Sequence, residues 1–267
     1  MNSSILAHLS WPQAKQALAE GRVVVVPIGS TEQHGPHLPV GTDFMVAETI
    51  AHQVARRTKC LVTPTIPIGY AHYHTDFPGS LSVSLSTLEA YIMESLSSLI
   101  HHGATHILFV NAHGGNMPAL DQVCYRLRRR GIVAATVLWW DVLGTLTPES
   151  SPAGHGDWIE TSMVLSTHPG TVTMEQARMP EVSDVDVDTL TLASPHAVLF
   201  RGVPVHVRLT TADYSPTGNM PEPGLTPHGD TSIPPTAASE ELGRRLIDTV
   251  VQFIVDLLDE FAKLKFH

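Results

Sequence analysis

Short apolar segments alternate with amphipathic segments along the first half of this chain. The apolar segments are rich in β-branched residues and cover Val23–Pro27, Leu61–Ile68, Ile107–Asn111 and Val133–Trp139. Stretches with helical spacing separate them at Phe44–Arg57, Ser86–His102 and Met117–Arg130. This alternation is typical of βαβ units, in which helices connect parallel strands and cover the faces of the sheet. It predicts an α/β fold with a mostly parallel β-sheet flanked by helices.

The second half of the chain is less regular. We expect one more strand at Val203–Leu209 and a long C-terminal helix from about Ala237 to Lys265, whose apolar residues share one face. Pro180–Pro204 has no clear period, and Tyr214–Pro235 holds too many prolines and glycines for regular structure. Because no linker divides the 267 residues, we expect residues 1–267 to form a single domain.

The charge composition argues against several classes of function. Charged residues make up 16% of the chain and the formal net charge is −10, which gives no electrostatic footprint for nucleic acid or an anionic membrane. No apolar run is long enough to span a bilayer, and the first residues lack the basic region of a secretory signal, so we expect a cytoplasmic protein. Cys60 and Cys124 are far apart, and we expect buried apolar residues rather than a disulfide or a metal pair.

Candidate metal ligands are concentrated directly after the first predicted strand. Glu32, His34 and Asp43 lie within twelve residues of one another, in a segment broken by glycines and prolines. Open α/β sheets place their ligands at the carboxyl ends of the strands, and carboxylates with imidazoles suit Zn²⁺ or Mn²⁺. In a purely structural alternative, Glu32 caps a turn and Asp43 caps the next helix. Three ligands in one irregular loop favour a metal site.

Two further segments carry the same residue types. His113 follows the third predicted strand in Asn111-Ala-His-Gly-Gly-Asn116, where Asn116 can cap the next helix. A phosphate-binding loop is the alternative, but its lysine and its glycine spacing are missing. His155 and Glu160 lie in a third segment, and Glu160 alone is ordinary there because carboxylates favour the first turn of a helix.

Taken together, the three segments resemble the creatininase (creatinine amidohydrolase) family. The matching stretches are Gly29-Ser-Thr-Glu-Gln-His-Gly-Pro-His37 with Asp43, Asn111-x-His113-Gly-Gly-Asn116 and His155-x-x-x-x-Glu160-Thr-Ser162, with Phe77-Pro-Gly-Ser80 and His74 as a further family segment. The resemblance implies a creatininase-like α/β fold, a two-metal site, and a homohexamer.

By position, the resemblance implies a role for each ligand. Asp43 would bridge two divalent ions, Zn and/or Mn, while Glu32 and His113 hold one ion and His34 holds the other. In creatininase itself a glutamate, two residues after the histidine of the Asn-x-His motif, also holds the second ion. Here that position is a glycine, and we expect Glu160 to replace the glutamate.

The resemblance also implies a reaction, namely hydrolysis of a C–N bond by a metal-activated water. His155, which is free of the metals in this assignment, would act as the acid and base. His74 and Tyr73 are the candidate substrate contacts, and His37 and Asn116 are expected to support the ligands. A non-catalytic structural metal site in an oligomer is the alternative from another class, but such sites commonly contain cysteine and none joins this set.

The substrate-facing segments differ from those of creatininase. Where creatininase has a Trp-Asp pair on a lid, this chain has Ser151-Pro-Ala-Gly154. Trp139-Trp140-Asp141 could line the substrate site or pack in the core. We therefore expect a small-molecule amide substrate with creatinine as the reference. The alternatives are activities of related proteins: deformylation of a formamide, cleavage of a peptide tail, and hydrolysis of a cyclic inositol ketone.

Overall fold

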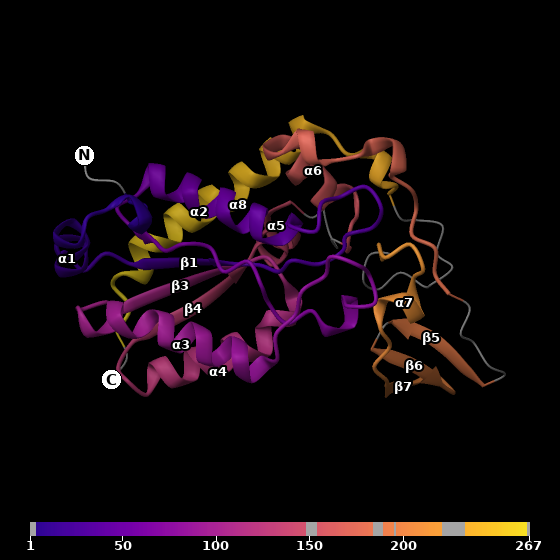
Figure 1. The fold of residues 1–267 in the computed structure, drawn as a ribbon, viewed down its shortest axis with the longest axis horizontal. Helices are drawn as coiled ribbons and strands as arrows, with labels where there is room; N and C mark the ends of the chain where they lie inside the picture. The colour runs from indigo at the N-terminus through magenta and orange to yellow at the C-terminus, as the bar shows by residue number, and fades with distance from the viewer. Residues whose placement is uncertain (1–3, 148–153, 184–188, 195, 221–232, 266–267) are drawn as a thin grey trace.

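The computed structural model describes residues 4–147, 154–183, 189–194, 196–220 and 233–265. Its centre is a parallel four-stranded sheet in the order β2 (Leu61–Val62), β1 (Val24–Ile28), β3 (His106–Asn111) and β4 (Val133–Leu138). Figure 1 shows this sheet between two layers of helices. The predicted α/β fold with a mostly parallel sheet flanked by helices is therefore confirmed.

Both faces of the sheet are buried, which explains the continuous apolar runs of its strands. Alternate residues point to opposite faces, so Val25 joins one core while Val24 and Val26 join the other. One face is covered by α2 (Thr42–Arg57), α5 (Trp139–Leu146), α6 (Trp158–Thr167) and α8 (Glu240–Phe261). The other is covered by α1 (Trp11–Ala19), α3 (Leu85–His101) and α4 (Met117–Arg128).

The C-terminal helix α8 packs most closely on α6. A Cβ atom built on Gly243 of α8 would lie only 1.8 Å from the carbonyl oxygen of Ser162 in α6, so a side chain at this position cannot be accommodated without moving one helix. The expected apolar face is present, with Leu246, Val250 and Ile254 buried. Among the described residues, no helix combines the length and the apolar composition that crossing a bilayer requires.

A second, antiparallel sheet corrects the prediction for the second half of the chain. It consists of β5 (Leu190–Ser194), β6 (Ala197–Phe200) and β7 (Val203–His206), followed by the short helix α7 (Thr211–Tyr214). The strand expected at Val203–Leu209 is thus β7, and it does not join the parallel sheet. Two of the strands fall in Pro180–Pro204, where the sequence has no clear period and no strand was predicted. Pro204 is tolerated because β7 is an edge strand.

Three smaller expectations are also corrected. The strand predicted at Leu61–Ile68 ends at Val62, because the prolines that follow cannot donate ladder hydrogen bonds, and only Ile66 forms a further bridge to the sheet. Trp139 begins α5 instead of ending β4. Cys60 is buried as expected, but Cys124 is only half-buried, and both are free thiols. Of the irregular segment Tyr214–Pro235, residues 221–232 lie outside the described part of the chain.

Candidate metal centre

The candidate site lies where β1 and β3 end side by side, since Ile28 pairs with Asn111 at the last position of the ladder. The loop after β1 carries Glu32 and His34, and the segment after β3 carries His113. Carboxyl ends of neighbouring parallel strands meet at one edge of the sheet, so the topology alone brings these side chains together.

Two helices supply the remaining carboxylates. Asp43 lies in the first turn of α2, which begins directly against the end of β1: a Cβ atom on Gly29 would lie 2.4 Å from the Phe44 nitrogen, so only glycine permits this approach. Glu160 lies in the first turn of α6. The Asp157 side chain accepts the backbone N–H of Glu160 at 2.9 Å and caps that helix.

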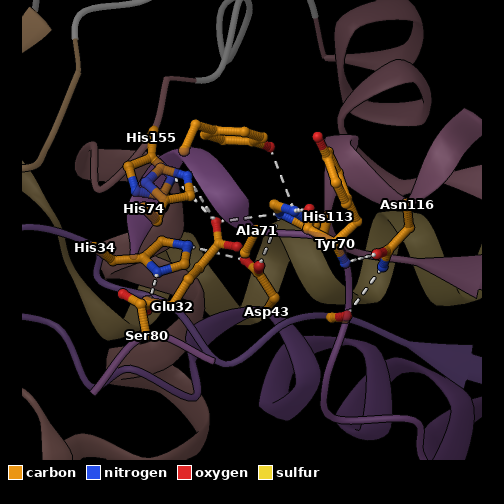
Figure 2. Close-up of polar contacts among 12 residues, drawn as sticks. Glu32, His34, Asp43, Tyr70, Ala71, His74, Ser80, His113, Asn116 and His155 are labelled. Atoms are coloured by element: carbon orange, nitrogen blue, oxygen red, sulfur yellow. Dashed lines mark hydrogen bonds and ion pairs between the residues drawn. The ribbon is translucent and has the colours of Figure 1, made fainter. Parts of the chain in front are cut away.

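Figure 2 shows the imidazoles of His34, His74, His113 and His155 gathered around the carboxylates of Glu32 and Asp43. Three groups of three ligands have their ligand atoms within 4.8 Å of one another. Beside the group of Glu32, His34 and His155, two groups share Asp43, one made of Glu32, Asp43 and His113, the other of His34, Asp43 and Glu160. All five residues of these two groups are buried. Asp43 belongs to both groups, which is the arrangement expected of a carboxylate that bridges two ions.

The distances assign the two Asp43 oxygens to different groups. His34 Nε2 lies 2.9 Å from Asp43 Oδ1 and 3.7 Å from Glu160 Oε2. His113 Nδ1 lies 3.3 Å from Asp43 Oδ2 and 3.1 Å from Glu32 Oε1. Asp43 therefore has one oxygen toward each ligand group and would be able to bridge two cations held there.

The carboxylates of this cluster are under-satisfied without a cation. Both oxygens of Glu32 and Oδ2 of Asp43 are buried and have no hydrogen bond of acceptable geometry, although His113 Nδ1 approaches both carboxylates. Burying an ionised carboxylate without such partners costs several kcal/mol, roughly, unless a counter-charge is present. The donor set, its burial and its unsatisfied oxygens all fit divalent cations.

Backbone carbonyls orient three of the four imidazoles. His34 Nδ1 donates to the Glu32 carbonyl at 3.0 Å, His113 Nε2 to the Tyr70 carbonyl at 2.9 Å, and His155 Nε2 to the Gln33 carbonyl at 2.7 Å. A carbonyl can only accept, so each of these nitrogens carries the proton. The other nitrogen of each ring faces the carboxylates and becomes a cation ligand once it is deprotonated, as in protein metal sites where a second partner fixes the tautomer of the ligating histidine.

Charges within the metal-free cluster balance one another. Burial alone would raise the pKa of Glu32, but the neighbouring imidazolium of His113 helps to hold this pKa well below its usual range, and Glu32 in turn raises the pKa of His113. Burial would lower the pKa of His34, but Asp43 and Glu160 raise it to about 10. Burial raises the pKa of Glu160 to about 8 against the opposing charge of His34. Protons therefore occupy the cluster in the absence of cations.

His155 differs from the other imidazoles because it lies at the edge of the cluster. Its side chain is 14% exposed, and its Nδ1 lies 3.9 Å from Glu32 Oε1. Its ring centre is 4.2 Å from that of His34 and 4.5 Å from that of His74. Burial, and after it the charge of His34, lower the pKa of His155 well below its usual range. A neutral imidazole with a free Nδ1 beside the carboxylates can accept a proton; with Glu32 and His34 it could also bind a cation.

The position of the missing creatininase glutamate is closed in this chain. A Cβ atom on Gly115 would lie 2.3 Å from the Tyr70 carbonyl oxygen and 2.5 Å from His113 Nε2. No side chain fits there while Tyr70 anchors His113. The Glu160 carboxylate, whose Oε2 accepts the backbone N–H of Gly156 at 2.7 Å, approaches from α6 instead.

The two predicted supporting residues act in different ways. His37 contacts Thr161 in α6 through Nε2 at 2.8 Å, and burial lowers its pKa to about 4, so its ring is neutral. Asn116 does not cap α4 with its side chain, contrary to expectation. Its amide donates to the Gly29 carbonyl at 2.9 Å and accepts from the Tyr70 nitrogen at 3.1 Å, which ties together the segments that carry the ligands.

The two residues predicted to contact the substrate, Tyr73 and His74, also have different surroundings. Tyr73 is half-buried, and its hydroxyl lies 3.4 Å from His113 Nε2; burial raises its pKa to about 12, so it remains a neutral hydrogen-bond donor. His74 is 1% exposed, and both its nitrogens contact protein atoms. Trp139 is buried in the core, so of its two expected roles it has the one in packing. Residues 148–153, which include most of Ser151–Gly154, lie outside the described part of the chain.

Two residues at the site were missed by the sequence analysis. The Gln33 side chain lies within 2.9 Å of both His74 Nδ1 and His155 Nε2, and Thr211 Oγ1 lies 2.7 Å from His74 Nδ1. Gln33 stands between two predicted ligands, so its place in the sequence was a usable signal. Thr211 is far away in the sequence, and no pattern pointed to it.

Fold and site together define an α/β protein with a candidate two-metal centre. The family model described as "Creatininase: Creatinine amidohydrolase" matches residues 7–258, so the chain belongs to the creatininase family. The chain is accordingly a hydrolase, and the resemblance noted in the sequence is confirmed.

Comparison with individual proteins agrees with this assignment. The chain is 33% identical over 188 residues to a mycofactocin precursor peptide peptidase of Mycolicibacterium smegmatis, covering 66% of this chain and 72% of the relative. It is 26% identical over 281 residues to a creatinine amidohydrolase of Pseudomonas putida, covering 97% of both. A crystal structure of creatinine amidohydrolase (creatininase) superposes with a TM-score of 0.73 at 23% identity, over 97% of this chain and 98% of that one, and so shares the fold.

Proposed function

We propose that this protein is a two-metal amidohydrolase that hydrolyses a C–N bond of a small or cyclic amide, with creatinine ring opening as the reference reaction. The observation that carries the proposal is the position of Asp43 between two ligand groups, with Glu32 and His113 on one side and His34 and Glu160 on the other. Bound there, Zn²⁺ and/or Mn²⁺ would supply Lewis acidity for the attack of water on an amide carbonyl.

The chain's own residues handle the protons. His155 is tethered through Nε2–H to the Gln33 carbonyl, which leaves Nδ1 as the atom that takes a proton from the attacking water. The same nitrogen then returns the proton to the leaving nitrogen, because its lowered pKa makes the imidazolium a ready donor. The neutral Tyr73 hydroxyl, half-buried beside His113, is placed to donate a hydrogen bond to the substrate.

The test is hydrolysis of creatinine to creatine by protein reconstituted with Mn²⁺ and Zn²⁺. Glu32→Gln should lose turnover together with one cation. His155→Ala should bind both cations, yet turnover should fall about 10²- to 10⁴-fold, the usual contribution of a general acid and base. Wild-type turnover in a fully loaded His155→Ala variant would contradict the proton-transfer role.

A second candidate reaction is cleavage of a peptide bond near the end of a small peptide. The 33% identity to a mycofactocin precursor peptide peptidase favours it. A panel of short peptides, assayed by mass spectrometry beside creatinine, separates the two. Cleavage of a peptide with no hydrolysis of creatinine would change the proposed substrate from a cyclic amide to a peptide. The proposed roles of Asp43 and His155 would stay the same.

We further propose that the protein acts in the cytoplasm as a homo-oligomer, a hexamer by family resemblance. The second sheet supports a contact between copies: Val198 lies opposite Val205, and Phe200 opposite Val203, so these four residues share one face. Phe200, Val203 and Val205 are exposed. An exposed apolar face on a three-stranded sheet favours burial against a partner. Light scattering coupled to size-exclusion chromatography gives the mass directly, and a monomer at micromolar concentration would contradict the proposal.

A further inference from the structure

His74 is the one imidazole of the cluster that no backbone carbonyl anchors. Its Nε2 lies 3.1 Å from Glu32 Oε1, and its Nδ1 lies 2.9 Å from Gln33 Nε2 and 2.7 Å from Thr211 Oγ1. Its ring stacks on His155, with 4.5 Å between the ring centres. The question is therefore which of its nitrogens carries the proton, because this decides whether His74 can hold a cation or can only donate to Glu32.

The polarity of the Gln33 amide is fixed by backbone groups at both ends. Its Oε1 accepts from the Gly35 nitrogen at 2.9 Å, and its Nε2 donates to the Gly218 carbonyl at 3.0 Å. The second hydrogen on Nε2 has two neighbours, His74 Nδ1 and His155 Nε2. His155 Nε2 already donates its own proton to the Gln33 carbonyl at 2.7 Å and cannot accept. The hydrogen therefore goes to His74 Nδ1.

Thr211 completes the assignment. A ring nitrogen that accepts from an amide carries no proton, so the Thr211 hydroxyl at 2.7 Å can only donate, and it shares the single lone pair of His74 Nδ1 with the Gln33 amide. The proton of a neutral His74 then resides on Nε2, where the nearest acceptor is Glu32 Oε1. This approach lies off the hydrogen-bond line, since Glu32 Oε1 has no hydrogen bond of acceptable geometry.

We propose that Gln33 and Thr211 hold His74 protonated on Nε2, so that His74 is a positioning residue that orients the Glu32 carboxylate toward one cation and does not itself bind a metal. This inference rests on the metal centre proposed above. It replaces the substrate contact expected from the sequence, since His74 is buried with both nitrogens engaged. It also makes α7 part of the centre, although α7 lies outside the parallel α/β layers.

The position of Thr211 permits a clean substitution. Thr211 is 1% exposed at the first position of α7. The helix is capped by its neighbour Thr210, whose hydroxyl accepts from the Asp213 nitrogen at 3.3 Å, so Thr211 is not needed for the cap. Thr211→Val removes the hydroxyl at nearly constant volume, while Thr211→Ser keeps the donor.

The experiment measures cation binding by the full-length chain, with Mn²⁺ as the probe in EPR titrations and Co²⁺ absorption as a report on ligand geometry. We expect Thr211→Val to bind one of its two cations about 10- to 100-fold more weakly than the wild type, the range seen when a partner of a ligand is removed. The Co²⁺ spectrum should change with it, and Thr211→Ser should restore both. Wild-type affinity and spectrum in a folded Thr211→Val would overturn the inference. A wild-type protein that binds fewer than two cations would instead refute the proposed centre.

A second measurement needs no substitution of Thr211. In zinc-loaded protein with ¹⁵N-labelled histidine, NMR correlations between ring nitrogens and carbons report which nitrogen carries the proton, and the His74 signals are assigned by their loss in His74→Gln. We expect a protonated Nε2 and an unprotonated Nδ1. A proton on Nδ1, or a metal-shifted Nε2, would overturn the inference.

Discussion

Replacing Gly243 with alanine should weaken both the fold and one half of the metal centre. The new Cβ would lie 1.8 Å from the Ser162 carbonyl oxygen, against the 3.4 Å at which ordinary contact begins, so α6 and α8 must separate. Forcing an extra methyl group into a packed interface costs about 1–3 kcal/mol of unfolding free energy. Glu160 lies two residues before Ser162 on α6, so the same shift disturbs the position of its carboxylate beside His34.

Two measurements on Gly243→Ala test this reasoning. Urea unfolding of the metal-free protein gives the stability loss through the midpoint and slope. Metal analysis after dialysis against limiting Mn²⁺ should show occupancy falling from two cations toward one. Gly170→Ala is the matched control, because no neighbouring atom lies within 4 Å of a Cβ there. Stability within about 0.5 kcal/mol of the wild type, the usual range of a neutral surface change, together with two retained cations, would refute the argument.

Three further predictions follow from the site. Glu160→Gln should bind one cation instead of two, with the Glu32 site still loaded, as counted by calorimetry; two tight sites would contradict its role. Without a cation, His34 has a pKa of about 10 and Glu160 a pKa of about 8, so both carry a proton at neutral pH. A cation must displace these protons, so its binding should release protons, and its affinity should weaken as pH falls from 8 to 6. Calorimetry in two buffers of different ionisation enthalpy counts the protons, and a pH-independent affinity would be inconsistent with these shifts. Gly115→Ala should lower cation affinity by displacing the Tyr70 carbonyl from His113, whereas Gly114→Ala, which meets nothing within 4 Å, should not; equal effects would disprove the steric argument.

The parallel sheet and the cluster of candidate ligands could be predicted because each leaves a local signal. Strands buried on both faces read as continuous apolar runs, and ligand residues directly after two such runs must meet at one edge of the sheet. Asp43 and His113 were found in this way, and the structure brings them together with Glu32.

The remaining features depend on contacts between segments far apart in the sequence. The β6–β7 turn contains Arg201 and Gly202, both with positive φ, which is the conformation of a tight hairpin turn. Arginine is not one of the residues from which such a turn is predicted. Thr211 reaches His74 because α7, which follows the second sheet, contacts the segment His72–His74. The Asn116 side chain was misjudged as a cap because the backbone groups it bonds belong to Gly29 and Tyr70, which no helix-start rule includes.

The carbonyl anchors of the imidazoles have a consequence for protein engineering. Tyr70 holds His113 through its main chain, while its half-buried ring stacks against that of His72, with 4.9 Å between ring centres. The side chain at residue 70 can therefore be varied to residues other than proline, because the carbonyl that holds His113 and the nitrogen that bonds Asn116 belong to the main chain. A library of substitutions at this position would search for altered substrate preference without moving His113, the proposed metal ligand.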